Sequence, residues 1–323
     1  MAADATSPVH ERRYRAMGSD AHLIVVGDPA LLDVAERRIE QLESRWSRFR
    51  PDSEVSLLNR RAGHLVPVSA DTVLLVERAV EAWRLTGGSF DPTVLGAMVL
   101  AGYDRSFDEL KDAVDVPAGH SELLIGCTDI TVVPDAVQLP SGTGFDPGGI
   151  GKGLTADIVA TELVQAGATG VCVNMGGDLR LLGEGPEGAA WTVALEHPWL
   201  TAPMVLVGLN HGAVATSTTL RRTWRADGEW RHHLIDPMTG EPSDSDLDLV
   251  SIVAGETWQA EVLAKAALLR GAERAFDILP PDVEALTVDR HGVVRTTPGL
   301  TAYTGGVVPP AQLDYSNDPR SNP

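Results

Sequence analysis

Helices and short strands are predicted to alternate along the chain. Residues 31–49 and 69–85 carry apolar side chains at helical spacing. Residues 154–167 and 257–271 show the same periodicity, and a short helix is predicted at 273–281. Shorter apolar runs between turns predict strands at 16–28, 121–140, 169–185, 191–198, 204–217, 247–255 and 285–300. These elements lack the regular spacing that βαβ units would give.

The predicted fold class is α+β. No Pro- or Ser-rich linker divides the chain, so we expect a single compact unit of mixed sheets flanked by helices. A division into two lobes is left open. We expect the unit to span residues 14–304, with a loose N-terminal tail at 1–13. Residues 305–323 are rich in Pro, Asn, Asp and Gly, and are predicted to form a loose C-terminal tail.

Composition narrows the classes of function. The 323 residues carry a net charge of −19, which disfavours binding to nucleic acid or to anionic membranes. No stretch approaches the roughly 20 apolar residues of a membrane span, and the first 20 residues carry no apolar run that would indicate a signal peptide. The sequence therefore predicts a cytoplasmic protein. The two cysteines, Cys127 and Cys172, are interpreted as small buried residues.

A glycine-rich segment, FDPGGIGKGLTAD at residues 145–157, has chemistry that suits a phosphate. Glycines allow close approach of the backbone, amides at a helix start bind anions, and Lys152 adds a positive charge. The segment matches neither the Walker loop nor the dinucleotide-binding GxGxxG pattern. Taken alone, a plain turn is the commoner explanation of such a segment, so both interpretations stay open.

Other polar segments stand beside this one in a fixed order. They are AMGSD (16–20), SRFRPDSEVSLLN (47–59), GGSFDPTV (87–94), VNMGGDLRLLG (173–183), VATSTTLRRTW (214–224), RHHLIDPMTGEP (231–242) and WQAEVLAKAALLRG (258–271). Each is short, but the ordered set, above all HLIDPMTG with DPGGIGKG, resembles the ApbE-like family of FAD:protein FMN transferases. The resemblance covers roughly residues 14–290.

This resemblance implies an enzyme. Its members bind FAD as a substrate and, with Mg²⁺, cleave the pyrophosphate. FMN passes to a Thr or Ser hydroxyl of a target flavoprotein and AMP leaves. The implied partner is an acceptor flavoprotein, which we expect in the cytoplasm.

The resemblance also assigns roles to residues. His233 and Asp236 match the catalytic segment, where the histidine is a candidate base for the accepting hydroxyl. Alone, a structural histidine beside a turn would be the commoner explanation of His233. The positions that match FAD contacts are Met17, Phe49, Thr93, Val94, Leu95, Asp146 and Lys152, with Phe49 in place of the family's frequent Tyr. The Gly149 carbonyl matches a backbone ligand of the metal.

One motif departs from the family pattern. The pattern close to ADALxT supplies metal ligands from Asp and Thr, whereas this chain has Glu261 and Lys265 at those positions. A charged lysine has no lone pair for a metal. Because the two residues are four apart on a predicted helix, we expect them to pair with each other. The hypothesis is that the Lys265 ammonium occupies or repels the metal position, so that Mg²⁺ binding is weakened or replaced.

Three functions remain open from the sequence. The first is transfer of FMN to a protein, and the second is binding of FAD without transfer. The third is hydrolysis of FAD to FMN and AMP by water.

Overall fold

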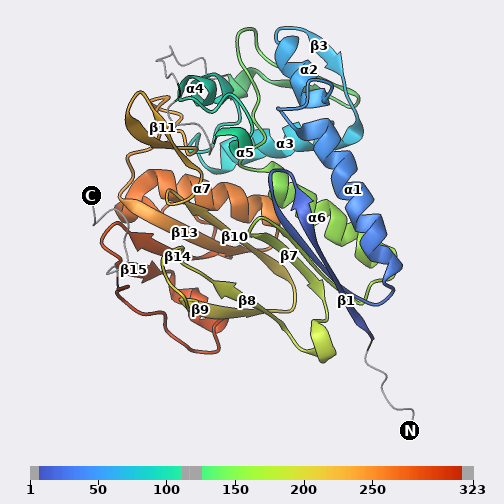
Figure 1. Ribbon diagram of the computed structural model, residues 1–323, viewed down its shortest axis with the longest axis vertical. Coiled ribbons are helices and arrows are strands. Elements are labelled where there is room, and N and C mark those ends of the chain that lie inside the picture. The colour runs from blue at the N-terminus through green and yellow to red at the C-terminus, as the bar shows by residue number, and fades with distance from the viewer. Residues whose placement is uncertain (1–6, 111–115, 117–125, 315–323) are drawn as a thin grey trace.

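An eight-stranded antiparallel sheet forms the centre of the structure (Figure 1), which is a computed structural model that describes residues 7–110, 116 and 126–314. The strands lie in the order β1-β2-β6-β7-β10-β13-β14-β15. Their bounds are β1 Val9–Ala16, β2 Ser19–Val26, β6 Gly170–Met175, β7 Asp178–Gly183, β10 Gly212–Thr218, β13 Leu247–Ala254, β14 Glu284–Asp289 and β15 Val294–Thr296. Every neighbouring pair is antiparallel.

Helices cover one face of this sheet and a hairpin covers the other. The covering helices are α1 (Ala30–Trp46), α6 (Gly151–Gln165) and α7 (Thr257–Arg274). The opposite face packs against β8 (Trp191–Leu195) and β9 (Val205–Leu209), which pair only with each other among the described strands. Strand β13 is buried along its whole length because both faces of the sheet are covered.

A second group of elements lies along the helical side of the sheet (Figure 1). It contains α2 (Glu54–Arg60), α3 (Ala70–Leu85), α4 (Leu95–Leu100), α5 (Phe107–Leu110) and the small sheet β3-β5-β4. The strands of that sheet are β3 Leu65–Pro67, β4 Thr131–Val133 and β5 Ala136–Gln138, and the separate hairpin β11-β12 spans Thr223–Ala226 and Glu229–His232. Short 3₁₀ helices occupy Cys127–Asp129, Pro186–Gly188 and Pro298–Ala302. The mixed α+β architecture predicted from the sequence is confirmed.

Side-chain caps explain several helix starts. Ser53 at the start of α2 accepts the Ser56 amide at 3.0 Å, and Ser69 at the start of α3 accepts the Thr72 amide at 3.4 Å. Helix α7 begins on a carboxylate from another element, because both oxygens of Asp157 accept the Thr257 and Trp258 amides at 2.9 Å. Burial of the Asp157 carboxyl raises its pKa to about 6, although these two amides oppose the shift.

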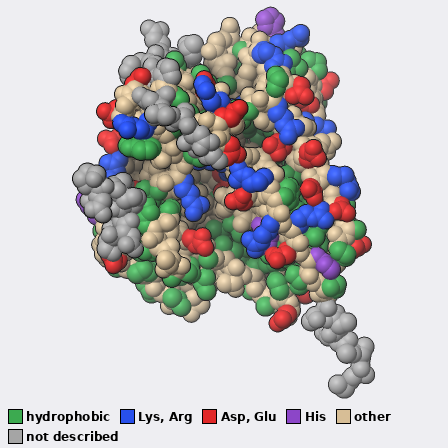
Figure 2. All heavy atoms as spheres, in the orientation of Figure 1, with side chains coloured by type: hydrophobic (Ala, Val, Ile, Leu, Met, Phe, Trp, Pro, Cys, Tyr) green, Lys and Arg blue, Asp and Glu red, His purple; other side chains and the backbone are tan. Residues whose placement is uncertain are grey.

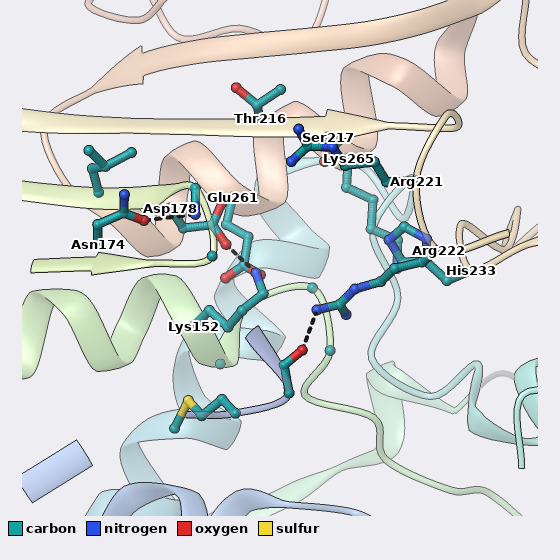
Figure 3. A pocket seen from close by; sticks show the side chains of 18 of the residues that line it. Lys152, Asn174, Asp178, Thr216, Ser217, Arg221, Arg222, His233, Glu261 and Lys265 are labelled. Carbon is teal, nitrogen blue, oxygen red and sulfur yellow. Dashed lines mark hydrogen bonds and ion pairs between the residues drawn. The ribbon is translucent and has the colours of Figure 1, made fainter. Parts of the chain in front are cut away.

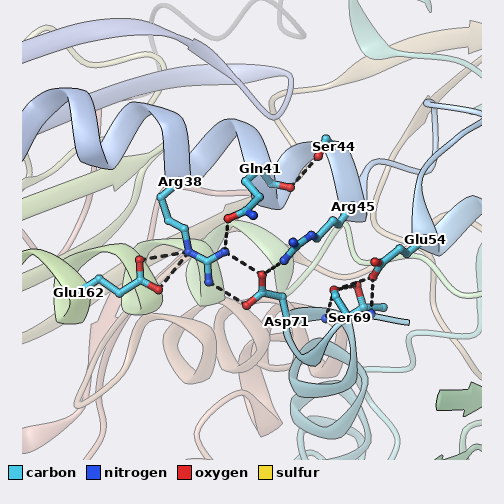
Figure 4. A network of polar contacts seen from close by, with 9 residues as sticks. Arg38, Gln41, Ser44, Arg45, Glu54, Ser69, Asp71 and Glu162 are labelled. Carbon is cyan, nitrogen blue, oxygen red and sulfur yellow. Dashed lines mark hydrogen bonds and ion pairs between the residues drawn. The ribbon is translucent and has the colours of Figure 1, made fainter. Parts of the chain in front are cut away.

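A cluster of charged side chains ties three helices together (Figure 4). Arg38 on α1 donates to both oxygens of Asp71 on α3, at 2.7 and 2.8 Å, and to both oxygens of Glu162 on α6, at 3.0 and 3.1 Å. Arg45, two turns further along α1, also donates to Asp71. Hydrogen bonds from Arg38 and the arginine charges hold the pKa of the Asp71 carboxyl below its usual range.

The structure corrects several boundaries. Strand β1 begins at Val9 and pairs with β2, so the predicted N-terminal tail at 1–13 was too long. Part of the predicted C-terminal tail is attached to the sheet, since Leu313 is 5% exposed, its amide donates to the Gly292 carbonyl at 2.8 Å, and the Val294 amide of β15 donates to the Ala311 carbonyl at 2.9 Å. Of the predicted helix at 273–281, residues 273 and 274 form the end of α7, after a kink at Gly271, and residues 275–278 form turns. Residues 121–125 of the predicted strand region at 121–140 lie outside the described residues.

Within the described ranges, none of the helices combines the length and the apolar composition needed to cross a membrane.

Candidate active site

A cavity of about 850 Å³ lies between the central sheet and the helical group. Its size is in the range typical of small-molecule sites. Its walls come from the β1–β2 turn, the end of α1, the glycine-rich segment, the β6–β7 turn, β10 and the loop after β12. In Figure 2, Lys and Arg side chains gather around the middle of the face, between the helical group and the sheet. The cavity lining holds as many Lys and Arg side chains as Asp and Glu side chains, in a molecule whose net charge is −19.

The β1–β2 turn brings Met17 to the cavity. Met17 and Gly18 both have positive φ, at 50° and 63°, as the two central residues of a type I′ hairpin turn require. The Met17 sulfur accepts a 3.5 Å hydrogen bond from Thr155 Oγ1 on α6. Met17, one of the residues predicted at the site, is among those that line the cavity.

An aromatic and cationic wall follows α1. The Arg48 guanidinium lies 4.1 Å from the centroid of the Phe49 ring and 4.7 Å from that of the Tyr103 ring. All three residues line the cavity, and Phe49 is 41% exposed. A planar ligand can stack against such a surface. Phe49 was predicted here from the sequence, whereas Arg48 and Tyr103 were not.

The glycine-rich segment forms the floor of the cavity beside this wall. Asp146 is 7% exposed, accepts the Gly148 amide at 2.9 Å, and lies 3.5 Å from Arg48 Nε. Gly153 sits where α6 crosses α7, because a Cβ at this position would lie 2.6 Å from the Thr257 carbonyl oxygen. The glycine-rich segment therefore lines the cavity and also allows α6 to pack closely against α7.

Lys152 joins two carboxylates at the centre of the cavity (Figure 3). Its ammonium donates to Glu261 Oε1 at 2.6 Å and also to Asp178. Burial opposes the charged form of Lys152, but the charges of Asp178 and Glu261 outweigh it, so the pKa of Lys152 is raised. Burial also raises the pKa of the Asp178 carboxyl, to about 7, against the opposing effect of Lys152.

Lys265 does not pair with Glu261, contrary to the expectation from their spacing. Glu261 is held on the other side, because its second oxygen accepts the Gly153 amide at 2.8 Å. Lys265 is only 7% exposed, yet among the described residues no carboxylate oxygen lies within 4.0 Å of its nitrogen. Its side chain lies against Gly149, where an added Cβ would be 3.4 Å from Lys265 Nζ.

These residues do not fit a Mg²⁺ site. Both oxygens of Glu261 already accept hydrogen bonds, and an ammonium stands beside Gly149 where the family pattern has a neutral oxygen ligand. Across the described ranges, no group of three His, Cys, Asp or Glu side chains is arranged to hold a metal.

Arg222 and His233 form the side of the cavity opposite the glycine-rich segment (Figure 3). Arg222 has a φ of 53° and donates to Ser19 Oγ at 2.7 Å. The Nδ1 atom of His233 is shielded from solvent and has no hydrogen-bond partner among the described residues. Burial lowers the pKa of His233 well below its ordinary value, and the charge of Arg222 adds to the shift. The ring is therefore neutral near pH 7 and can accept a proton.

Four predicted site residues lie outside the cavity lining. Asp236 folds the turn after β12, where its Oδ1 accepts the Met238 amide at 2.8 Å. Thr93 is 2% exposed and donates to Asp91, while its own Oγ1 accepts the Gly126 amide. Val94 and Leu95 follow Thr93 at the start of α4 and also do not line the cavity. Their sequence pattern therefore marks a buried turn in this structure.

Sequence reasoning missed several lining residues, among them Arg48, Tyr103, Asp178 and Arg222. Asp178 carried a recognisable pattern, because it follows two glycines at the end of an apolar strand. Arg222 lies in the segment VATSTTLRRTW (214–224) that carries part of the family resemblance, but no role was predicted for it, since its place depends on the turn between β10 and β11.

Comparison with known proteins decides the family. The model of the ApbE family matches residues 17–287, which is most of the chain. This chain belongs to the ApbE family. An FAD:protein FMN transferase of Treponema pallidum is 32% identical over 298 residues, covering 84% of this chain and 80% of that protein. An FAD:protein FMN transferase of Haemophilus influenzae is 26% identical over 303 residues, covering 88% of this chain and 86% of that protein.

Solved structures of ApbE proteins share the fold. The ApbE protein of Thermotoga maritima superposes with a TM-score of 0.80 over 92% of this chain and 99% of its own. The apo form of the flavinyl transferase ApbE of Pseudomonas stutzeri gives the same score over 94% and 99%. Both are 23% identical to this chain, so they establish the architecture alone.

Proposed function

We propose that this chain transfers FMN from FAD to a hydroxyl group of an acceptor protein and releases AMP. The observation that carries the proposal is the meeting of Lys152, Arg222 and His233 on one cavity of about 850 Å³. Membership of the ApbE family and the similarity to two FAD:protein FMN transferases support the same activity.

The cavity offers separate environments for the parts of FAD. Met17, Phe49 and Tyr103 supply apolar and aromatic surface for a flat ring system. Arg222 supplies positive charge for the pyrophosphate, and Lys152, which already donates to Asp178 and Glu261, has a third N–H left to donate. The predicted FAD contacts Met17, Phe49, Asp146 and Lys152 remain part of this proposal, whereas Thr93, Val94 and Leu95 are not retained as direct contacts.

The proposed reaction is a displacement at phosphorus. The acceptor oxygen attacks the phosphorus of the FMN half, and a new P–O bond forms as the bond to the bridging oxygen breaks. AMP leaves with that oxygen and its electron pair. The neutral His233 ring takes the proton of the attacking hydroxyl, and the fixed cations offset the charge that develops on the leaving phosphate.

The acceptor is proposed to be a flavoprotein that presents a Thr or Ser side chain. We keep the cytoplasmic location predicted from the sequence as part of the proposal, and cell fractionation tests it.

A single incubation tests the activity. The full chain is mixed with FAD and a panel of Thr- or Ser-bearing flavoprotein domains, and products are separated by mass spectrometry. Covalent FMN on an acceptor with equimolar AMP supports transfer. Free FMN with AMP indicates hydrolysis by water instead, and intact bound FAD with no products indicates a binding protein.

His233→Gln tests the role of the base. Transfer should fall by about 100-fold or more, the usual contribution of a positioned base, while FAD binding changes little. His232→Gln is the matched control, because the neighbouring ring contacts the Ser243 carbonyl and does not line the cavity. Equal losses in both variants would contradict the assignment.

A further inference from the structure

Lys265 stands in a place where lysine is rarely found. It is 93% buried from solvent on the wall of the cavity, and no ion pair within 4.0 Å compensates its charge among the described residues. Lysine is almost never so buried unless it is paired, because removing an ammonium from water costs several kcal/mol. A ligand that brings negative charge to this point would remove that penalty.

The nearest carboxylates do not supply the missing partner. Glu261 is held by Lys152 and the Gly153 amide, and Asp146 is held by the Gly148 amide and Arg48. Asp91 has one oxygen without a hydrogen bond, but it too lies beyond 4.0 Å from Lys265 Nζ. The nearest aromatic contact is Phe90, whose ring centroid is 5.5 Å from the ammonium.

The ammonium also lies beside the glycine-rich segment. An added Cβ at Gly149 would be 3.2 Å from Lys265 Cδ and 3.4 Å from its nitrogen. Lys152, three residues further along, lines the same cavity, and Arg222 faces it from the other side (Figure 3). Three cationic side chains from α6, α7 and the β10–β11 segment therefore converge on one space.

We propose that the Lys265 ammonium takes the place of a divalent cation at this site, so that the chain binds FAD without a metal. The inference rests on the proposed function for the identity of the ligand. The pyrophosphate carries one negative charge on each phosphate, and Arg222 and Lys265 supply the two matching charges, because Lys152 is already paired with Asp178 and Glu261. Burial lowers the pKa of Lys265, and a bound anion favours the charged form again.

The first test uses the unaltered full chain. FAD affinity is measured by quenching of flavin fluorescence in 5 mM EDTA and in 5 mM Mg²⁺, and Mg²⁺ alone is titrated into the FAD-loaded protein by calorimetry. The two dissociation constants should agree within about twofold, with no Mg²⁺ binding heat. Affinity that is at least tenfold tighter in Mg²⁺, or stoichiometric binding of Mg²⁺, overturns the proposal.

Lys265→Met tests the contribution of the charge. Loss of one charged contact to a phosphate should weaken FAD binding by about 10- to 100-fold. Riboflavin, which has no phosphate, is the matched ligand, and its affinity should stay within about twofold. If both ligands weaken equally, Lys265 only supports the cavity wall and the proposal fails.

A double variant approaches the question from the opposite direction. Glu261→Asp with Lys265→Thr restores the family pattern of oxygen ligands, and FAD binding should then become at least tenfold tighter when Mg²⁺ is added. If this variant binds FAD equally well with and without Mg²⁺, the proposal that Lys265 takes the place of the metal is contradicted. Failure of the unaltered chain to bind FAD under any condition would refute the proposed function instead, so the two failures are distinguishable.

Discussion

At the scale of single residues, burial sets the chemistry of His233. Its Nδ1 is shielded from solvent, and the positive charge of Arg222 acts on the ring in the same direction as burial. Both effects disfavour the imidazolium. A base that stays neutral well below pH 6.5 is available for proton transfer across the whole physiological range.

We predict that His233 titrates below pH 6.5 in the folded chain, because burial and Arg222 lower its pKa. NMR of ring-labelled histidine identifies its resonance by comparison with His233→Gln. The unfolded chain binds this proton more readily, so the free energy of unfolding should fall as the pH drops below about 6.5. That loss should be smaller in His233→Gln. A resonance that titrates at or above pH 6.5 would contradict the prediction.

Residue positions were partly predictable from the sequence. Met17, Phe49, Asp146, Gly149, Lys152, His233, Glu261 and Lys265 were all predicted at the site, and all line the cavity. The partner of Glu261 was not predictable, because the i,i+4 rule considers one helix and Lys152 comes from another. Asp236 and Thr93 do not line the cavity, because Asp236 closes its own turn and Thr93 joins Asp91 to the Gly126 amide.

At the scale of elements, the crossing of α6 and α7 determines the geometry of the site. Gly153 allows the two helices to approach, and Asp157 caps α7 from within α6. Lys152 and Glu261 meet because their helices cross at this point. Both helices were predicted from the spacing of their apolar residues. Their crossing was not predicted, because the sequence around a glycine does not show whether that glycine packs against the backbone of another helix.

Gly153→Ala should lower the free energy of unfolding by about 1–3 kcal/mol, as overpacking usually does. The added methyl would lie 2.6 Å from the Thr257 carbonyl oxygen. This oxygen belongs to the backbone, so it cannot move away by a change of side-chain rotamer. Chemical denaturation measures the change. Gly151→Ala is the control on the same helical turn, where the nearest contact would be an ordinary 3.5 Å, so it should be neutral or stabilising. The reverse order of stabilities would refute the crossing argument.

At the scale of the whole molecule, the two ends of the folded unit lie outside the predicted limits. The early strand β1 begins inside the predicted tail because its charged side chains alternate with half-buried ones, a weak pattern for an edge strand. The C-terminal segment is irregular, so composition suggested a loose tail, yet Leu313 belongs to the core under the β8–β9 hairpin. One buried apolar residue in an otherwise polar segment does not form a sequence pattern from which packing against the core can be predicted.

Leu313→Ala should therefore destabilise the chain by about 2–5 kcal/mol, the usual cost of emptying a buried leucine site. Val308→Ala in the same segment is the control, because Val308 is 73% exposed and its loss should change stability by less than about 0.5 kcal/mol. Thermal and urea unfolding measure both. Equal, small effects would mean that the segment contributes nothing to the core.

The charged cluster around Arg38 has a consequence for how the cavity can open. It joins α1, which leads into the Arg48 wall, to α6, whose first turn carries Lys152. Any relative displacement of these two walls would have to break the contacts of Arg38 with Asp71 and Glu162. The opposite side of the cavity takes no part in this cluster, since Arg222 stands just before β11 and His233 just after β12. Arg222 is held there by a different contact, its hydrogen bond to Ser19 Oγ in the β1–β2 hairpin. The two sides of the site are therefore positioned by separate sets of polar contacts.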